Sequence, residues 1–207
     1  RYVEKDVERA LNTVRADMAA LSRTANDWAA WDDAWAFAGG GNPGFIEENL
    51  YGGVFQNLRL SVILFLDREG AVFAGRAFDL AAQAEVPVPA SIPAYLAAHR
   101  GFLCADSSSE GEVGIIHLPE GHLMAASRPI TNNARTAPAR GTLLMGRFLD
   151  AAEVRRLGER LGLSLTIVAP EAPGASADMR EAPAKLADAG PILVAPLFNT
   201  FEPLQDA

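Results

Sequence analysis

The first 37 residues contain neither glycine nor proline, the two residues that most often interrupt a helix. Their apolar side chains recur every three or four positions, and a repeat averaging about 3.5 residues is typical of a helix with a narrow apolar seam. The seam consists of Val3, Val7, Leu11 with Ala10, Val14, Met18, Leu21, Ala25 and Trp28. A helix over residues 1–37 would be roughly 55 Å long at about 1.5 Å per residue, whereas a compact domain of this size has a radius of about 13–17 Å.

Part of this helix is therefore expected to extend beyond its own domain and to need a partner for its seam. We expect self-association through the N-terminal helix, most simply with the same helix of a second copy. The alternative is a helix that lies wholly on a sheet of its own chain.

A glycine-rich loop at residues 39–44 ends the helix, and the periodicity then changes to that of strands. The segment 58–66 is apolar at most positions, which predicts a strand covered on both faces. It runs into Asp-Arg-Glu-Gly at 67–70, a hairpin turn. Further strands are expected at 71–78, 113–118, 122–131, 141–149, 163–169 and 191–198, and helices at 45–51, 87–99, 151–161 and 177–189. Short turns and adjacent pairings favour an α+β fold with an antiparallel sheet over a doubly wound parallel one.

The charge balance and the cysteine count exclude several classes of partner and site. The formal net charge is −8 and the chain has only two lysines, Lys5 and Lys185, so neither nucleic acid nor an anionic lipid surface is expected to bind. The single cysteine, Cys104, rules out an internal disulfide and a multi-cysteine zinc site. The sequence shows no apolar run long enough for a membrane span and begins at Arg1. We expect it to be part of a longer polypeptide.

Residues 27–35 hold all three tryptophans and form the most distinctive segment. On a continuous helix, Trp28, Trp31 and Trp35 share one face. The next seam position is Asp32, and a carboxylate in a buried seam is costly unless it is paired or hydrogen-bonded. One interpretation is a ligand-facing carboxylate framed by indoles. The other is that Asp32 clamps the loop that follows while the tryptophans pack.

Evidence for catalysis or metal binding is weak. The aspartates at 27, 32 and 33 do not follow a calcium-loop pattern. His117 and His122 flank a predicted hairpin turn and could approach each other, but two histidines make an incomplete metal site. The serines at 107–109 lack the context of a nucleophile, and Cys104 has no evident activating partner. We therefore expect no cofactor, no metal and no enzymatic activity in this chain.

Two arginines lie inside predicted strands and share faces with apolar residues. Arg128 alternates with Met124 and Ala126, and Arg147 lies in the same position relative to Leu143 and Met145. A strand arginine that points into a pocket suits a carboxylate ligand, which it binds with two parallel hydrogen bonds. The alternatives are a salt bridge to an acidic residue such as Asp32, or a guanidinium that reaches the sheet edge.

Together these features resemble a known family, the CHASE domain of the fourth class, an extracytoplasmic sensor module. The resemblance covers roughly residues 5–169. It rests on the Asp-Trp-Ala-Ala-Trp-Asp-Asp block at 27–33 after a long helix, aromatic residues at 35 and 37, Glu-Asn-Leu at 48–50, Asp-Arg-Glu-Gly at 67–70, Ser-Arg-Pro-Ile at 127–130 and the strand at 141–149.

The resemblance implies a long N-terminal helix packed on a PAS-like antiparallel β-sheet, with a small-molecule pocket on the other side of the sheet. Residues 1–169 would form this sensor domain, and 170–207 a C-terminal αβ extension whose last strand is missing or trimmed. Such domains lie between two membrane helices of bacterial receptors. They face the periplasm or the exterior and relay ligand occupancy to cyclic-di-GMP turnover or histidine kinase outputs. The membrane is then a partner only through flanking spans absent from this chain.

We therefore expect a ligand-sensing domain of a transmembrane receptor that binds an unidentified small molecule. The residues expected at or near the ligand are Trp28, Trp31, Asp32, Trp35, Asn49 and Arg128. If the long helix packs on the sheet face opposite the pocket, the tryptophan segment is a structural clamp instead. Two other hypotheses are a ligand-free dimerisation and transmission module and, less favoured, a hydrolase that uses Asp27 or Asp32.

Overall fold

The computed structural model describes residues 2–104, 106–167 and 180 of the chain. Its helices are α1 (Tyr2–Ala29), α2 (Asp32–Ala38), α3 (Phe45–Asn49), α4 (Gly52–Leu58), α5 (Ser91–Ala98) and α6 (Ala151–Leu161), with a short 3-10 turn at Arg100–Phe102. Its strands are β1 (Val62–Leu66), β2 (Val72–Asp79), β3 (Ala84–Val86), β4 (Val113–Leu118), β5 (Gly121–Pro129) and β6 (Thr142–Phe148).

The six strands form one antiparallel sheet in the order β3-β2-β1-β6-β5-β4. Consecutive strands pair through short connections within β1–β3 and, with a longer loop before β6, within β4–β6. The two groups meet at the centre, where Val62 of β1 pairs with Gly146 of β6. The expected α+β class, a long helix packed on an antiparallel sheet, is confirmed.

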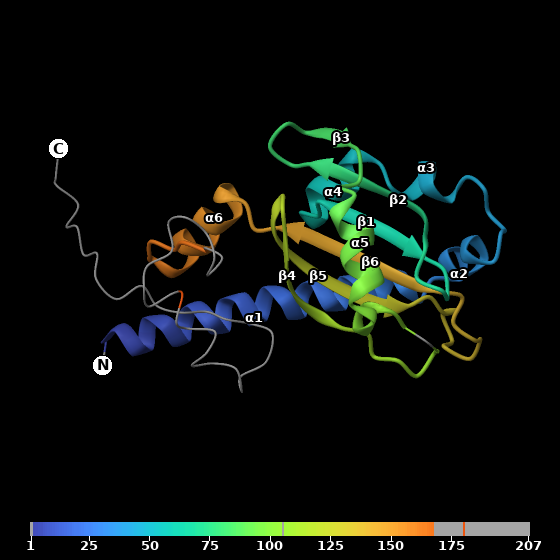
Figure 1. Cartoon of the computed structure of the whole chain (residues 1–207), viewed down its shortest axis with the longest axis horizontal. Helices are drawn as coiled ribbons and strands as arrows, with labels where there is room; N and C mark the ends of the chain where they lie inside the picture. The colour runs from blue at the N-terminus through green and yellow to red at the C-terminus, as the bar shows by residue number, and fades with distance from the viewer. Residues whose placement is uncertain (1, 105, 168–179, 181–207) are drawn as a thin grey trace.

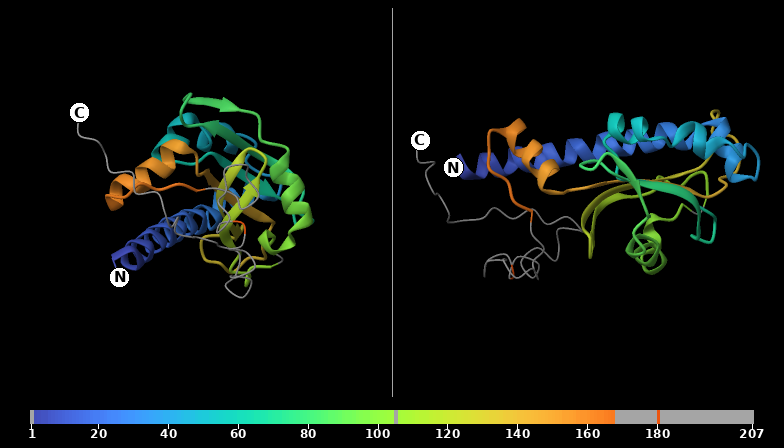
Figure 2. Two further views of the ribbon diagram at one scale, coloured as in Figure 1. Left: turned by 60° about the vertical axis from the view of Figure 1, so that its left-hand side comes forward. Right: turned by 90° about the horizontal axis from the view of Figure 1, so that it is seen from above.

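Helices cover both faces of the sheet (Figure 2). Strand β1 shows the consequence, since all five of its residues are buried. Ile63 and Phe65 join the core on the α1 side, whereas Val62, Leu64 and Leu66 join the core beneath α5. The expectation that this strand is covered on both faces is confirmed.

The seam of α1 packs against the sheet of its own chain. Its buried members are Ala10, Val14, Met18, Leu21, Ala25 and Trp28. On the sheet they meet the core that includes Met124, Ala126 and Met145. The N-terminal half of α1 runs past the sheet and lies beside α6 (Figure 1). Within the described residues, the seam is thus used mainly inside the chain, and self-association through this helix stays a prediction.

The expected single helix over residues 1–37 is wrong, because the chain breaks at Ala30 and Trp31. Trp31 has an extended backbone, and α2 starts at the next residue. The carbonyl of Ala29 accepts a hydrogen bond from the N–H of Thr131 at 2.8 Å. This contact from the end of β5 takes the place of a further helical bond, and tertiary structure therefore overrides local helix propensity.

Other boundaries also differ from expectation. The strand expected at 58–66 begins only at Val62, because residues 52–58 form α4, which Arg59 ends in a left-handed conformation. Strand β3 was not expected, and residues 163–167 form no strand. The remainder of that expected strand, the elements expected at 177–189 (apart from Arg180) and 191–198, and the domain boundary at 169/170 lie outside the described residues.

Candidate functional site

A polar cleft of about 420 Å³ lies between the C-terminal half of α1, the loop before β4 and the end of β5. This volume is in the range of small-molecule sites. Its lining residues are Ser22, Arg23, Asn26, Ser107, Ser108, Ser109, Glu110, Arg128, Pro129 and Arg135. We call this site the arginine cleft, since three guanidinium groups line it against one carboxylate.

Arg128 connects the parts of the cleft. Its Nη1 donates to the carbonyl of Glu110 at 2.5 Å and to the carbonyl of the preceding residue, Ser127, at 2.7 Å. Its Nη2 donates to the hydroxyl of Ser22 on α1. The side chain leaves β5 on the same face as Met124 and Ala126, as the alternation in that strand predicted, and in the structure α1 covers this face. Burial is the largest cause that lowers the pKa of Arg128, yet an arginine stays charged at neutral pH.

The serine loop that forms one wall is fixed by its own hydrogen bonds. Oδ1 of Asp106 accepts from the backbone N–H groups of Ser108 and Ser109 at 2.8 and 3.1 Å, and from the Ser108 hydroxyl at 2.5 Å. These bonds lower the pKa of Asp106. The hydroxyl of Ser107 donates to the carbonyl of Ala137 at 3.0 Å. The wall is therefore held in place before any ligand arrives.

Gly111 lets this wall approach the sheet closely. Its φ is +69°, and a Cβ at this position would lie 2.0 Å from the carbonyl oxygen of Ser127. A side chain would push the loop away from β5. The glycine therefore sets the position of the Glu110 carbonyl against Arg128.

Arg135, from the loop after β5, also lines the cleft and is also hydrogen-bonded to α1. Its Nη1 donates to Oδ1 of Asn26 at 3.1 Å and its Nη2 to the Asn26 carbonyl at 3.4 Å. Arg23, which lies on α1 itself, is exposed. The cleft is thus locally positive in a chain whose net charge is −8.

Asp32 is exposed, so the expectation that it occupies a buried seam is wrong. It lies in the first turn of α2, where its Oδ1 accepts from the backbone N–H of Asn133 at 2.9 Å and its Oδ2 from the Asn133 side chain at 3.1 Å. Both carboxylate oxygens therefore hold the loop at 132–139. Asp32 is therefore a clamp, as the alternative proposed, but it holds the loop at 132–139 and not the loop that directly follows its own helix.

The tryptophans hold the same region together. Trp28 stacks on Trp31 with ring centroids 4.5 Å apart. The indole N–H of Trp35 donates to the carbonyl of Pro138 at 3.0 Å, and the guanidinium of Arg140 lies 3.3 Å from the centroid of the Trp35 ring. The three indoles are outside the lining of the arginine cleft, and their contact with a ligand stays a prediction.

Asn49 lies in α3, in another part of the molecule. Its side chain donates to the carbonyl of Phe45 at 2.9 Å, one turn earlier in the same helix. Next to α3 is a second, mostly apolar hollow of about 490 Å³, lined by Phe37, Gly40, Gly41, Pro43, Ile46, Glu47, Phe73, Ala74 and Gly75. Of the six residues expected at the ligand, the arginine cleft contains Arg128 alone.

The two histidines at the β4–β5 turn do approach each other, as expected. His117 pairs with His122 across the hairpin, and their ring centroids are 4.9 Å apart. Burial, with a smaller contribution from the charge of His117, lowers the pKa of His122. Within the described residues, His, Cys, Asp and Glu side chains form no group of three that could hold a metal ion.

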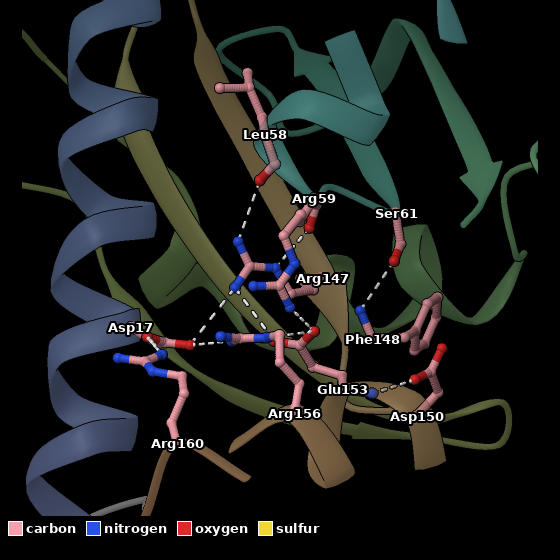
Figure 3. Close-up of polar contacts among 10 residues, drawn as sticks. All are labelled: Asp17, Leu58, Arg59, Ser61, Arg147, Phe148, Asp150, Glu153, Arg156 and Arg160. Carbon is pink, nitrogen blue, oxygen red and sulfur yellow. Dashed lines mark hydrogen bonds and ion pairs between the residues drawn. The ribbon is translucent and has the colours of Figure 1, made fainter. Parts of the chain in front are cut away.

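A network of ion pairs joins α1, β6 and α6 (Figure 3). We call it the ion-pair network; its members are Asp17, Arg59, Arg147, Glu153, Arg156 and Arg160. Arg147, the second strand arginine, lies at its centre, with Nη1 3.5 Å from Glu153 and 3.8 Å from Asp17. Its Nε and Nη2 donate to the carbonyls of Arg59 and Leu58. The salt-bridge alternative for Arg147 is therefore confirmed, although its partners are not Asp32.

Asp17 attaches α1 to α6 within this network. Its two oxygens accept from Arg156 at 2.7 Å and from Arg160 at 2.8 Å. Burial alone would raise the pKa of Asp17, but the two guanidiniums outweigh it and hold the pKa below its usual value. Burial, with the neighbouring arginines, also lowers the pKa of Arg59 to about 10. The network thus carries a surplus of positive charge.

Sequence reasoning missed this network, although one signal was present. Glu153, Arg156 and Arg160 are spaced three and four residues apart, which places them on one side of α6. Glu153 is only 8% exposed and contacts three arginines, including Arg59. Nothing in the local pattern around Asp17 marked it as their partner.

The family model described as CHASE4 domain matches residues 13–168. The methanogenesis regulatory histidine kinase FilI of Methanothrix harundinacea (strain 6Ac) is 33% identical over 175 residues, which are 84% of this chain and 20% of that protein. The chain thus spans about a fifth of the length of this curated relative.

Two solved structures show a more distant likeness, each at 13% sequence identity. A domain from a Vibrio parahaemolyticus protein assigned to the sensory box/GGDEF family has a TM-score of 0.42, covering 76% of this chain and 65% of that one. The extracellular domain of a protein described as histidine kinase vpHK1S-Z8 has a TM-score of 0.48, covering 77% and 60%. No helix in the described residues is both long and apolar enough to cross a membrane.

Proposed function

This chain belongs to the CHASE4 family of sensor domains, and from that premise we propose that it binds a small molecule in the arginine cleft and relays its presence along α1. The family match confirms the resemblance drawn from the motif at 27–33. In this proposal the domain lies in the periplasm or outside the cell, as part of an inner-membrane receptor. It carries no catalysis of its own.

One observation carries the choice of site: the arginine cleft has walls from both the sheet and α1. Arg128 projects from β5 and donates to Ser22 of α1, while Arg135 projects from the loop after β5 and donates to Asn26 of α1. A molecule bound between them contacts the long helix and the sheet together. If α1 has two arrangements relative to the sheet, the ligand shifts the equilibrium between them by the difference in its affinity for each. A tenfold difference in affinity corresponds to about 1.4 kcal/mol.

The proposed output is a histidine kinase, with cyclic-di-GMP turnover as the alternative. The kinase output is favoured because the curated relative, whose match covers 84% of this chain, is named as a histidine kinase. Self-association through α1 fits the same scheme. The N-terminal half of α1 runs past the sheet, beyond the part of the seam that the sheet covers (Figure 1).

A thermal-shift screen of carboxylates, phosphates, amines and neutral polar compounds tests the proposal. A ligand present at 100 times its Kd stabilises the folded state by about 2.7 kcal/mol, which raises Tm by roughly 5–10 °C in a domain of this size. The shift should be lost in Arg128→Gln and kept in Arg155→Gln, which changes an exposed arginine on α6. If every class leaves Tm unchanged, or if Arg128→Gln responds like the unaltered chain, ligand sensing in this cleft is wrong.

A further inference from the structure

Two of the three guanidiniums of the arginine cleft are hydrogen-bonded to neighbouring residues of one helix. Arg128 is bound to Ser22 and Arg135 to Asn26. Ser22 and Asn26 are four residues apart on α1, so they lie on the same side and about 6 Å from each other. The positive charge of Arg135 also contributes to lowering the pKa of Arg128. The fold thus keeps two like charges at one cleft, where an anion between them would relieve their repulsion.

The bonds of each guanidinium leave room for such an anion. An arginine has five N–H donors in a planar fork. Within the described part of the chain, Arg128 makes three hydrogen bonds and Arg135 makes two. The hydroxyl of Ser22 accepts from Arg128 and keeps its own proton to donate. Donors therefore predominate at the meeting point of α1 and β5.

The remaining lining of the cleft argues against other classes of ligand. An apolar ligand would need a cleft lined by hydrophobic side chains, but the lining is largely serine, asparagine and arginine. A cation would face three guanidiniums, and Glu110 is the single carboxylate among the lining residues. Asp106, on the same loop, is not among the lining residues, and its Oδ1 accepts from Ser108 and Ser109.

We infer that the ligand of the arginine cleft is a small organic anion whose carboxylate or phosphate group lies between the guanidiniums of Arg128 and Arg135. This inference rests on the proposed function and specifies its ligand class. Arginine forks bind both oxyanions with paired, charge-assisted hydrogen bonds. The serines at 107–109 also line the cleft, and because the hydroxyl protons of Ser107 and Ser108 already donate within the protein, these two hydroxyls can offer the rest of the molecule only acceptor oxygens. An oxyanion also competes with Ser22 and Asn26 for the same guanidiniums, so occupancy changes the bonds that hold α1.

Calorimetric titration of the chain tests this inference with four probes: succinate, inorganic phosphate, the neutral isostere succinamide, and 1,4-diaminobutane. We expect succinate or phosphate to bind at least about tenfold more tightly than succinamide, because the guanidiniums then donate to a neutral amide oxygen in place of an anionic one. The stronger of the two anions identifies which oxyanion the cleft takes. Arg135→Gln should raise the Kd of that anion by about tenfold or more, whereas Arg155→Gln should change its Kd by less than about twofold.

The outcomes separate this inference from the proposed function. Succinamide or the diamine binding as tightly as the anions, with loss of binding in Arg128→Gln, would keep the cleft as a ligand site and overturn the anion assignment. An anion whose Kd is the same in Arg135→Gln as in the unaltered chain would overturn the assignment too. Failure of every probe, together with a thermal-shift screen without any response, would overturn the proposed function itself.

Discussion

Replacing Asp17 by asparagine should destabilise the fold through the ion-pair network. The side chain of Asp17 is only 12% exposed, and its two oxygens bind Arg156 at 2.7 Å and Arg160 at 2.8 Å. Asparagine keeps the shape but offers one acceptor oxygen, and its NH₂ group faces a guanidinium. One of the two ion-pair hydrogen bonds is lost, and the other keeps its charged guanidinium donor but has a neutral acceptor.

The size of the effect follows from these two bonds. A hydrogen bond to a charged group contributes about 1.5–3 kcal/mol and a neutral one about 0.5–1.5 kcal/mol. The two arginines are 28% and 46% exposed, so solvent screens part of the gain. We therefore expect Asp17→Asn to lower the free energy of unfolding by about 2 kcal/mol at pH 7, or Tm by roughly 4–8 °C.

The effect should depend on pH in a defined direction. The pKa of Asp17 is lower in the folded protein than its usual value of about 3.9. Its contribution is therefore complete well above that value and is lost as the pH falls through the folded pKa. The stability gap between the unaltered chain and Asp17→Asn should stay constant from about pH 7 to 5 and shrink below about pH 4.

Urea unfolding followed by far-ultraviolet circular dichroism, at pH 7, 5, 4 and 3.5, measures this gap. Asp6→Asn is a matched control on the same helix, because Asp6 pairs with Arg9 at 3.0 Å while 41% exposed. Such a surface pair contributes less than about 1 kcal/mol. If Asp17→Asn costs no more than Asp6→Asn, or if the gap is independent of pH, the network does not attach α1 to α6 as described.

Three further variants test the loops around the cleft. Asp32→Ala removes both bonds to Asn133 and should cost about 1 kcal/mol in urea unfolding, since the site is exposed; an unchanged midpoint would exclude the clamp. Gly111→Ala should lower Tm and weaken the binding of any cleft ligand, because its Cβ would overlap the strand; Gly40→Ala, with open space around its Cβ, is the control for a positive φ alone. Trp35→Phe should cost about 1 kcal/mol through the bond to Pro138 but leave ligand affinity within about twofold, and a larger loss of affinity would place the indole at the ligand.

Local sequence signals predicted much of the architecture because they reflect local physics. The apolar run that forms β1 needs cover on both faces, and the turn after it needs Gly70 with its φ of +93°. The break between α1 and α2 was not predictable in the same way. It depends on a hydrogen bond from Thr131, about a hundred positions along the chain, to the carbonyl of Ala29.

In the candidate site, too, local sequence predicted some features, while others depend on contacts between residues that are far apart in the chain. Alternation along β5 correctly placed Arg128 on an apolar face, and the structure adds what surrounds it there. Arg135 gave no signal in the sequence, since it comes from an irregular loop that approaches α1 only in the folded chain. The tryptophan segment stood out by composition, but most of the polar bonding capacity of Asp32 and Trp35 is used on the loop at 132–139.

The pairing of β1 with β6 at the centre of the sheet also shapes how the chain reaches its fold. Within β1–β3 and within β4–β6 the strands are close in sequence and can form early, whereas joining the two groups requires closure of a long loop. Until β6 arrives, β1 presents Val-Ile-Leu-Phe-Leu along an unpaired edge. Such an apolar edge is prone to pair with other chains. A segment at the centre of the native core is therefore exposed to aggregation during folding.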